Sequence, residues 1–215
     1  MDVIWNGKRL FAAGPDTHCV RVRREPGSFF VGVRFHPGVA ACVLHWPADE
    51  LIDARPDLAL IWGRSAAELE ERLAATPNPS DALALLEAAI TARVKVASEP
   101  DHLILALVAC LRDRPRTSVA DLSRELAISE RQLRRRCRPT LGYGPKTLAR
   151  VLRVQRFLSL AAHSPKSSLA QLAVSAGYFD QAHLGNECVR LAAMSPRALV
   201  RHAIEDGRNF QDSAA

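Results

Sequence analysis

The feature that most constrains this chain is a pair of helical segments that meet at a very tight turn within residues 119–138. The second segment, SERQLRRRCR at 129–138, carries five arginines. Ser129 is suited to cap this helix, and Gln132 stands three residues later, where it can complete a capping box. The pattern therefore predicts a helix-turn-helix whose second helix is strongly basic.

The second helix of this unit has one apolar face and one charged face. Leu133 and Cys137 lie four residues apart and are expected to point inward, and Ile128 stands where it would form a hydrophobic staple with Leu133. The side chains left outside are Glu130, Arg131, Arg134, Arg135 and Arg138. Such a face suits the major groove of DNA, and the alternative is a basic helix that is only solvated.

The same organisation recurs downstream. Residues 169–177 repeat the form of residues 119–127, and a further helix follows from 181 after one additional turn residue. Asp180 is the expected cap, and Phe179 with Leu184 is the expected staple. Small residues four apart are expected to let the helices approach closely, at Ser123 with Ala127 and at Ala173 with Gly177.

A helical pattern at 145–160 connects the two units and is about 24 Å long at 1.5 Å per residue. The second helices of the two units could then lie in successive segments of the major groove, roughly 34 Å apart. In total the C-terminal half has seven predicted helices, at about 100–112, 118–126, 130–138, 145–160, 168–175, 181–191 and 196–205.

The basic charge of the chain is confined to this half. Residues 1–98 contain 11 Lys and Arg against 12 Asp and Glu, whereas residues 99–215 contain 18 against 11. Within residues 129–156, nine basic residues accompany a single acid, Glu130. A concentration like this suits a polyanion, and nucleic acid is the default candidate.

Residues 1–62 have a β-rich and irregular pattern. Short apolar or alternating runs at 3–5, 19–23 and 29–35 are separated by turn signals, and Asn6-Gly7 is suited to a hairpin. Helices are predicted to begin near Pro47 and, with a capping box, at Ser65.

A longer helix is predicted at 80–94. Leu83, Leu86, Ile90 and Val94 form an apolar stripe along it, with Leu85 and Ala89 beside the stripe. The stripe is either part of a core or a helix that mediates dimerisation. Ser98-Glu-Pro100 breaks the helical run, and we place a domain boundary there.

The sequence lacks the motifs that are typical of several functional classes. No Gly-rich phosphate loop, G-x-S-x-G elbow or H-E-x-x-H helix is present, so we expect neither an enzyme nor a cofactor. His36-x5-Cys42-x2-His45 matches no common ligand spacing, which favours ordinary side chains over a metal site. Five widely spaced cysteines indicate reduced thiols. Without a membrane span or signal peptide, we expect a cytoplasmic, nucleoid-associated protein.

Residues 100–205 resemble the AraC/XylS family of bacterial transcription regulators. The motifs that carry the resemblance are SERQLRR at 129–135, LGYGPK at 141–146, RVQR at 153–156, AGY at 176–178, DQAHL at 180–184 and MSPR at 194–197. The resemblance implies base-reading positions at Arg131, Arg134, Arg135, Gln181, Ala182, Gly185 and Asn186. Phosphate contacts are expected at Arg138, Lys146, Arg150 and Arg153.

The chain departs from the family pattern at several positions. Cys137 and Cys188 stand where the family usually has a core Phe, and Ala127 and Ala193 replace common glycines. The usual Ser-Arg of the second recognition helix is Gly185-Asn186, which lacks the arginine's charge. We therefore expect the first unit to dominate affinity.

The N-terminal segment resembles, more weakly, the sensory part of one AraC-like subgroup. The likeness rests on DVIWNG at 2–7, AGPD at 13–16 and VRFHPG at 33–38. In those relatives more β-structure precedes the point where this chain begins, so the resemblance implies a truncated sensor.

Together these features predict an α+β protein with two domains. Residues 1–97 would be a β-rich sensory or dimerisation-like region with a helical tail, and residues 98–215 an all-α, paired helix-turn-helix domain. The expected function is sequence-specific transcription regulation through double-stranded DNA. RNA polymerase, a small-molecule effector and a second copy of the chain are further candidate partners. The competing class is a non-DNA interaction module or small enzyme, with the arginine helix solvated or docked on an anionic protein.

Overall fold

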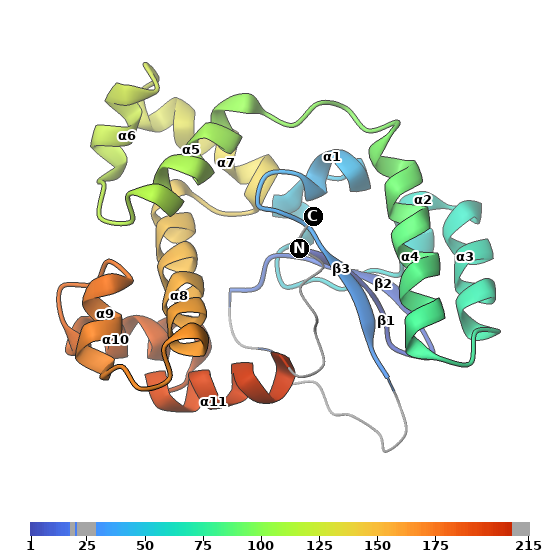
Figure 1. Cartoon of the computed structure of the whole chain (residues 1–215). Helices are drawn as coiled ribbons and strands as arrows, with labels where there is room; N and C mark the ends of the chain where they lie inside the picture. Colours follow the sequence, from blue (N-terminus) through green and yellow to red (C-terminus); the bar gives the residue numbers. More distant parts are fainter. Residues whose placement is uncertain (18–19, 21–28, 208–215) are drawn as a thin grey trace.

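The protein is α+β, with a small antiparallel sheet near the N-terminus and a helical C-terminal part (Figure 1). The computed structural model describes residues 1–17, 20 and 29–207, and for 204–207 the backbone alone. The fold class predicted from the sequence is confirmed. The predicted strand at 19–23 lies outside the described residues, apart from Val20.

The sheet has the strand order β2-β1-β3, with both neighbouring pairs antiparallel. Its strands are β1 (Asp2–Trp5), β2 (Leu10–Ala13) and β3 (Val31–Arg34). The predicted hairpin at Asn6-Gly7 is confirmed, because β1 and β2 pair across it. The Asn6 Oδ1 atom accepts hydrogen bonds from the backbone N–H groups of Lys8 and Arg9, at 3.0 and 2.8 Å, and Gly7 supplies a positive φ of 87°.

Three short helices follow the sheet, α1 (Ala40–Leu44), the 3₁₀ helix η1 (Ala48–Leu51) and α2 (Leu58–Trp62), and then the longer α3 (Arg64–Ala74) and α4 (Pro79–Val94). The helix α1 was not predicted, since five residues are too few to establish a helical period. The capping box at Ser65 was wrong. Gly63 occupies the N-cap position of α3, and the Ser65 hydroxyl donates backward to the Trp62 carbonyl, at 2.9 Å.

Helix α4 packs against the sheet through β3, begins one residue before the predicted start and is capped by Asn78. Leu86 and Ile90 are buried in the N-terminal core, whereas Val94 is exposed. Most of the predicted stripe is therefore core. Its alternative role in dimerisation stays a prediction.

All seven predicted C-terminal helices are present: α5 (His102–Asp113), α6 (Val119–Glu125), α7 (Glu130–Leu141), α8 (Pro145–His163), α9 (Leu169–Ser175), α10 (Gln181–Ala192) and α11 (Pro196–Gly207). Both α7 and α8 extend three residues beyond the predicted ends. In Figure 1, α8 connects α5–α7 at one end with α9–α11 at the other.

Two separate apolar clusters hold these helices together. One buries Leu107, Leu122 and Leu133 around the first half of α8, and the other buries Phe157 and Tyr178 around its second half. The N-terminal part has its own cluster, which includes residues from Val3 to Ile90. The boundary at 97/98 stays a prediction.

The turn of each helix-turn-helix contains one residue in the left-handed region. These residues are Ala127, with a φ of 51°, and Gly177, with a φ of 96°. Ala127 is exposed, so its small size does not serve a close helix crossing as predicted from its spacing to Ser123. The turn requires a backbone conformation that glycine adopts readily and alanine adopts at a cost.

Replacing Ala127 with glycine is expected to raise the free energy of unfolding by about 1 kcal/mol, because it relieves the strained backbone. Urea denaturation would measure the change. Ala120→Gly is the matched control, since Ala120 is exposed on α6 in ordinary helical geometry. That control should lower stability by about 0.5–1 kcal/mol. A loss of stability in Ala127→Gly would contradict the argument.

Candidate DNA-binding surface

The first helix-turn-helix consists of α6 and α7. The predicted capping box is confirmed, because the Ser129 hydroxyl accepts from the Gln132 backbone N–H, at 3.2 Å, and the Gln132 side chain accepts from the Ser129 N–H, at 3.1 Å. Leu133 and Cys137 are fully buried, and Ile128 packs in the same cluster. This burial fixes the rotation of α7 and leaves its arginines on the outside.

Seven of the nine basic residues in 129–156 are exposed: Arg136, Arg156 and a group of five, which are Arg131, Arg134, Arg135, Arg138 and Lys146. Within the described part of the chain, none of these five has a hydrogen bond or an ion pair. Lys146 also lies in the first turn of α8, whose N-terminus favours anions. These cations can meet a polyanion without first breaking a contact inside the protein.

The other four basic side chains are engaged within the protein. Arg136 pairs with Asp101 at 2.8 Å, and Arg150 lies 3.4 Å from the buried carboxylate of Glu187 without forming a hydrogen bond to it. The Arg153 guanidinium lies over the Tyr178 ring, 5.5 Å from its centroid. Arg150 and Arg153 thus have intramolecular partners, and the phosphate contacts expected of them stay predictions.

The second helix-turn-helix consists of α9 and α10. Asp180 caps α10 as predicted, accepting from the His183 N–H at 2.7 Å. The predicted staple was wrong: Phe179 is 85% exposed, and the adjacent Tyr178 fills the core instead. The predicted base-reading residues Gln181, Ala182 and Asn186 are exposed on α10, and Gly185 is half-buried.

The two units also contact each other directly, which was not predicted. Arg116, in the loop before α6, donates to the carbonyls of Val174 and Tyr178, at 3.3 and 3.2 Å. Arg156 on α8 donates to the carbonyls of Ser175 and Arg112, both at 3.1 Å. We call these two side chains the arginine clamp.

A close approach of the backbone reinforces the clamp. A Cβ atom placed on Gly177 would lie 2.9 Å from Pro115, which immediately precedes Arg116. Gly177 therefore serves both the left-handed turn and this contact. The loop before α6 sits directly on the turn of the second unit.

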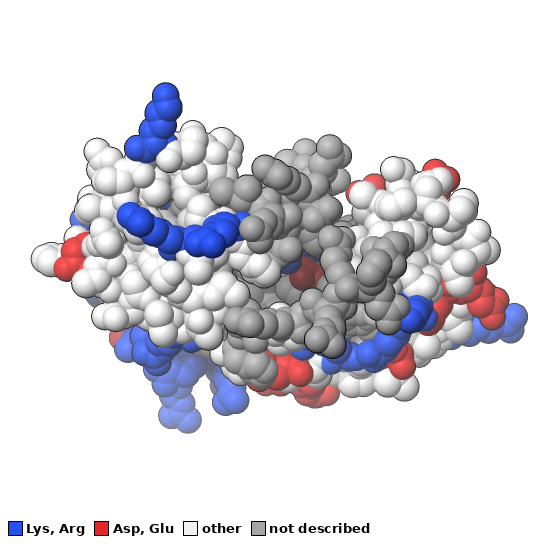
Figure 2. All heavy atoms as spheres, turned by 90° about the horizontal axis from the view of Figure 1, so that it is seen from below, with Lys and Arg blue, Asp and Glu red and all other residues white. Residues whose placement is uncertain are grey.

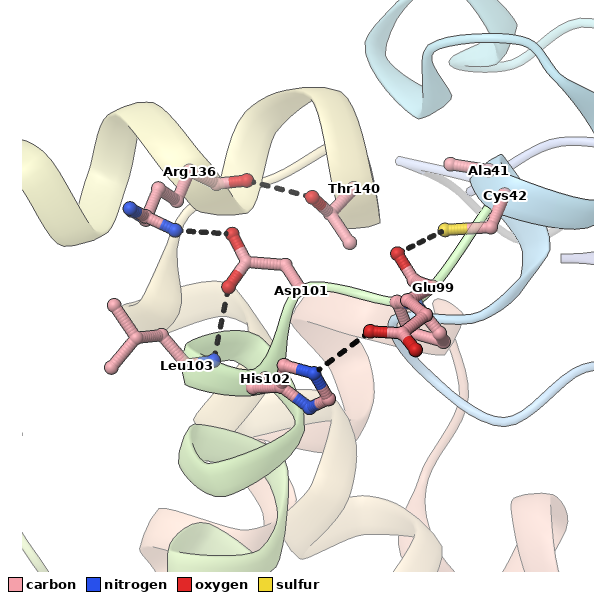
Figure 3. Close-up of a pocket in the computed structure, with 9 residues that line it drawn as sticks. Ala41, Cys42, Glu99, Asp101, His102, Leu103, Arg136 and Thr140 are labelled. Atoms are coloured by element: carbon pink, nitrogen blue, oxygen red, sulfur yellow. Dashed lines mark hydrogen bonds and ion pairs between the residues drawn. The ribbon is translucent and has the colours of Figure 1, made fainter. Parts of the chain in front are cut away.

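The C-terminal end of α7 contacts the N-terminal part of the protein, through η1 and α1. Gly142 ends α7 with a φ of 82°, and a Cβ atom there would lie 2.3 Å from Pro15. Beside this contact is an open cavity of about 550 Å³, whose lining includes Cys42 from α1 and Arg136 and Thr140 from α7. Figure 3 shows the Arg136–Asp101 ion pair on one side of it and the Cys42 thiol facing the Glu99 carbonyl on the other.

Comparison with known protein families identifies the helical C-terminal part of the chain. A family model described as a helix-turn-helix domain, of the AraC type, matches residues 122–202. These residues form an AraC/XylS-type DNA-binding domain. No curated protein and no solved structure matches the chain.

The AraC/XylS-type domain makes the protein a DNA-binding transcription regulator. The match covers α7, α8 and α10, and therefore most of the surface described above. It does not extend to the N-terminal part, whose resemblance to a sensor stays a prediction.

In the described part of the chain, no helix combines the length and apolar character that a membrane span needs. No cluster of three potential metal-binding side chains occurs among the described residues either.

Helices α7 and α10 each have a buried cysteine on the inner face. Burial raises the pKa of Cys137 to about 12 and that of Cys188 to about 11, from an ordinary value of 9.0. In the folded protein both groups therefore remain protonated thiols at pH 8. As pH rises from about 9 through these values, deprotonation favours the unfolded chain and stability falls.

Native protein treated with iodoacetamide at pH 8 is expected to be alkylated at Cys42 and Cys110, which are half-buried, well before Cys137 and Cys188. Mass spectrometry of peptides after timed quenching would measure the rates. Protein unfolded in urea is the control, and all four of these thiols should react in it. Equal rates at Cys137 in native and unfolded protein would refute its burial.

Proposed function

We propose that the protein binds specific DNA sequences as a paired reader, with α7 and α10 in successive segments of the major groove. The observation that carries this proposal is the exposed, unpartnered set of arginines on α7, together with a second capped helix-turn-helix on the same connector. α8 has 19 residues and is about 28 Å long, which is close to one turn of DNA. A cytoplasmic location at the nucleoid follows from this proposal.

The two helices have different chemistry. On α7, Arg131, Arg134 and Arg135 can make bidentate hydrogen bonds to guanine O6 and N7. Arg138 on α7 and Lys146 on α8 can bind phosphates. On α10, Gln181 and Asn186 are neutral amides suited to adenine N6 and N7. Neutral side chains release no counterions, so we propose that α7 supplies most of the affinity and of its salt dependence.

Arg134→Ala is expected to cost about 1–3 kcal/mol on the preferred sequence and to relax specificity at one base position. Lys146→Ala should weaken binding to all sequences alike. It should also make the slope of log K against log salt concentration shallower by about one. Titration of selected and random duplexes at several salt concentrations would separate the two effects.

Arg136→Ala is the matched control, because it removes the same charge from the same helix but from a side chain already paired with Asp101. It should keep the base preference of the unchanged protein. Equal losses on selected and random DNA for Arg134→Ala would overturn its assignment as a base reader. If the unchanged protein preferred no selected sequence, the result would favour the competing class, an interaction module that does not bind specific DNA sequences.

The arginine clamp is expected to fix the half-site spacing that the domain accepts. Arg116→Ala removes two hydrogen bonds from a charged group, each worth on the order of 1.5–3 kcal/mol before solvent screening. The preference for the correct operator over one with an inserted base pair should then fall by about tenfold. Binding titrations on the two duplexes would measure this ratio.

Arg112→Ala controls for the loss of charge, since Arg112 contributes its carbonyl rather than its side chain to the clamp. It should leave the spacing preference unchanged. If Arg116→Ala weakened binding to both duplexes by the same factor, the clamp would not determine spacing.

RNA polymerase, a small-molecule effector and a second copy of the chain remain proposed partners. For an effector, the cavity beside Arg136 is the place where a bound molecule would touch both α1 and α7. Such a molecule could compete for the Arg136–Asp101 pair and thereby change how the C-terminal end of α7 is held.

A further inference from the structure

The exposed side of α10 is mostly uncharged and partly apolar, unlike that of α7. Phe179 just before the helix is 85% exposed, Val189 is 58% exposed, and Ala182 is also exposed. Within α10, Ala182, Asn186 and Val189 follow a spacing of four and three and share one face, and Phe179 lies one residue before the N-cap Asp180. Figure 2 views the molecule from below, the side on which α9–α11 lie in Figure 1; its surface there is largely uncharged but crossed by a band of Lys and Arg side chains.

Local contacts hold the Phe179 ring outside the core. Tyr178 is fully buried, and its ring meets the His183 ring edge-on, with centroids 5.3 Å apart. The Phe179 backbone N–H points to the His183 Nδ1 atom, at 3.5 Å. Since Tyr178 and Leu184 fill the interior, Phe179 has no apolar site available to it in the core.

We propose that Phe179 and Ala182 bind the C5-methyl group of thymine in the major groove, and so make the second half-site specific for A·T pairs. This inference rests on the proposed function, in which the first turn of α10 enters the groove. Thymine is the only base whose major-groove edge presents a methyl group, and apolar side chains are its usual partners.

The neighbouring polar groups favour DNA over a protein as the occupant of this face. Gln181 and Asn186 flank the apolar side chains, and their amides match the adenine edge. An A·T pair can therefore be recognised on both bases from one helix. A protein partner would instead have to bury these two amides, which costs free energy unless each finds a hydrogen bond.

The test replaces thymine with uracil, which removes the methyl group and leaves base pairing intact. An operator selected with the full chain is synthesised with uracil at each thymine of the second half-site in turn. The unchanged protein should bind about three- to tenfold more weakly at one position, consistent with loss of a buried methyl. Phe179→Ala should bind the thymine duplex more weakly and show no thymine preference at that position.

Val189→Ala is the matched control, because it shortens an exposed apolar side chain on α10 that lies ten residues after Phe179. It should retain the thymine preference. Melting curves should show Phe179→Ala to be folded, since an exposed ring contributes little to stability.

Each outcome decides between the alternatives. A thymine preference that survives in Phe179→Ala overturns the inference. So does a Phe179→Ala variant whose binding to DNA is unchanged but whose self-association or binding to RNA polymerase is reduced. Protection of the first half-site alone in footprinting would instead refute the paired reading on which the inference rests.

Discussion

The arrangement of the C-terminal part depends on one helix that is buried in two different cores. α8 gives Leu148 and Leu152 to the cluster around the first unit, and Val154 and Phe157 to the cluster around the second. Because close-packed cores resist small displacements, the helix cannot rotate in one cluster without disrupting the other. The phase of the apolar residues along α8 therefore determines how far apart α7 and α10 lie and which way each faces.

The same helix explains why basic residues close together in the sequence have different roles. Arg150, Arg153 and Arg156 follow one another around α8, where they meet Glu187, Tyr178 and backbone carbonyls. The arginines on α7 meet solvent because that helix turns its apolar face to the core. Of the nine basic residues in 129–156, four therefore have an intramolecular partner and five have none within the described part of the chain.

Local signals predicted much of this structure. Capping at Ser129 and Asp180, the helical periods and the Asn6-Gly7 hairpin each depend on residues within a few positions of one another, and the structure confirms them. Contacts between distant segments were not predictable in this way. The carbonyls that accept from Arg116 lie about sixty positions along the chain. Similarly, two adjacent aromatic residues compete for one interior site, and periodicity alone does not tell that Tyr178 rather than Phe179 occupies it.

The arginine clamp has a consequence for how the protein can diverge among descendants. Its acceptors on the second unit are main-chain carbonyls, which every amino acid carries. Substitutions at Val174 and Ser175 therefore leave the acceptors in place, provided that α9 keeps its helical course. Substitutions at the exposed residues of α10 can therefore accumulate almost independently of the contact between the two units. New target sequences can evolve in this way while the arrangement of the two units stays the same.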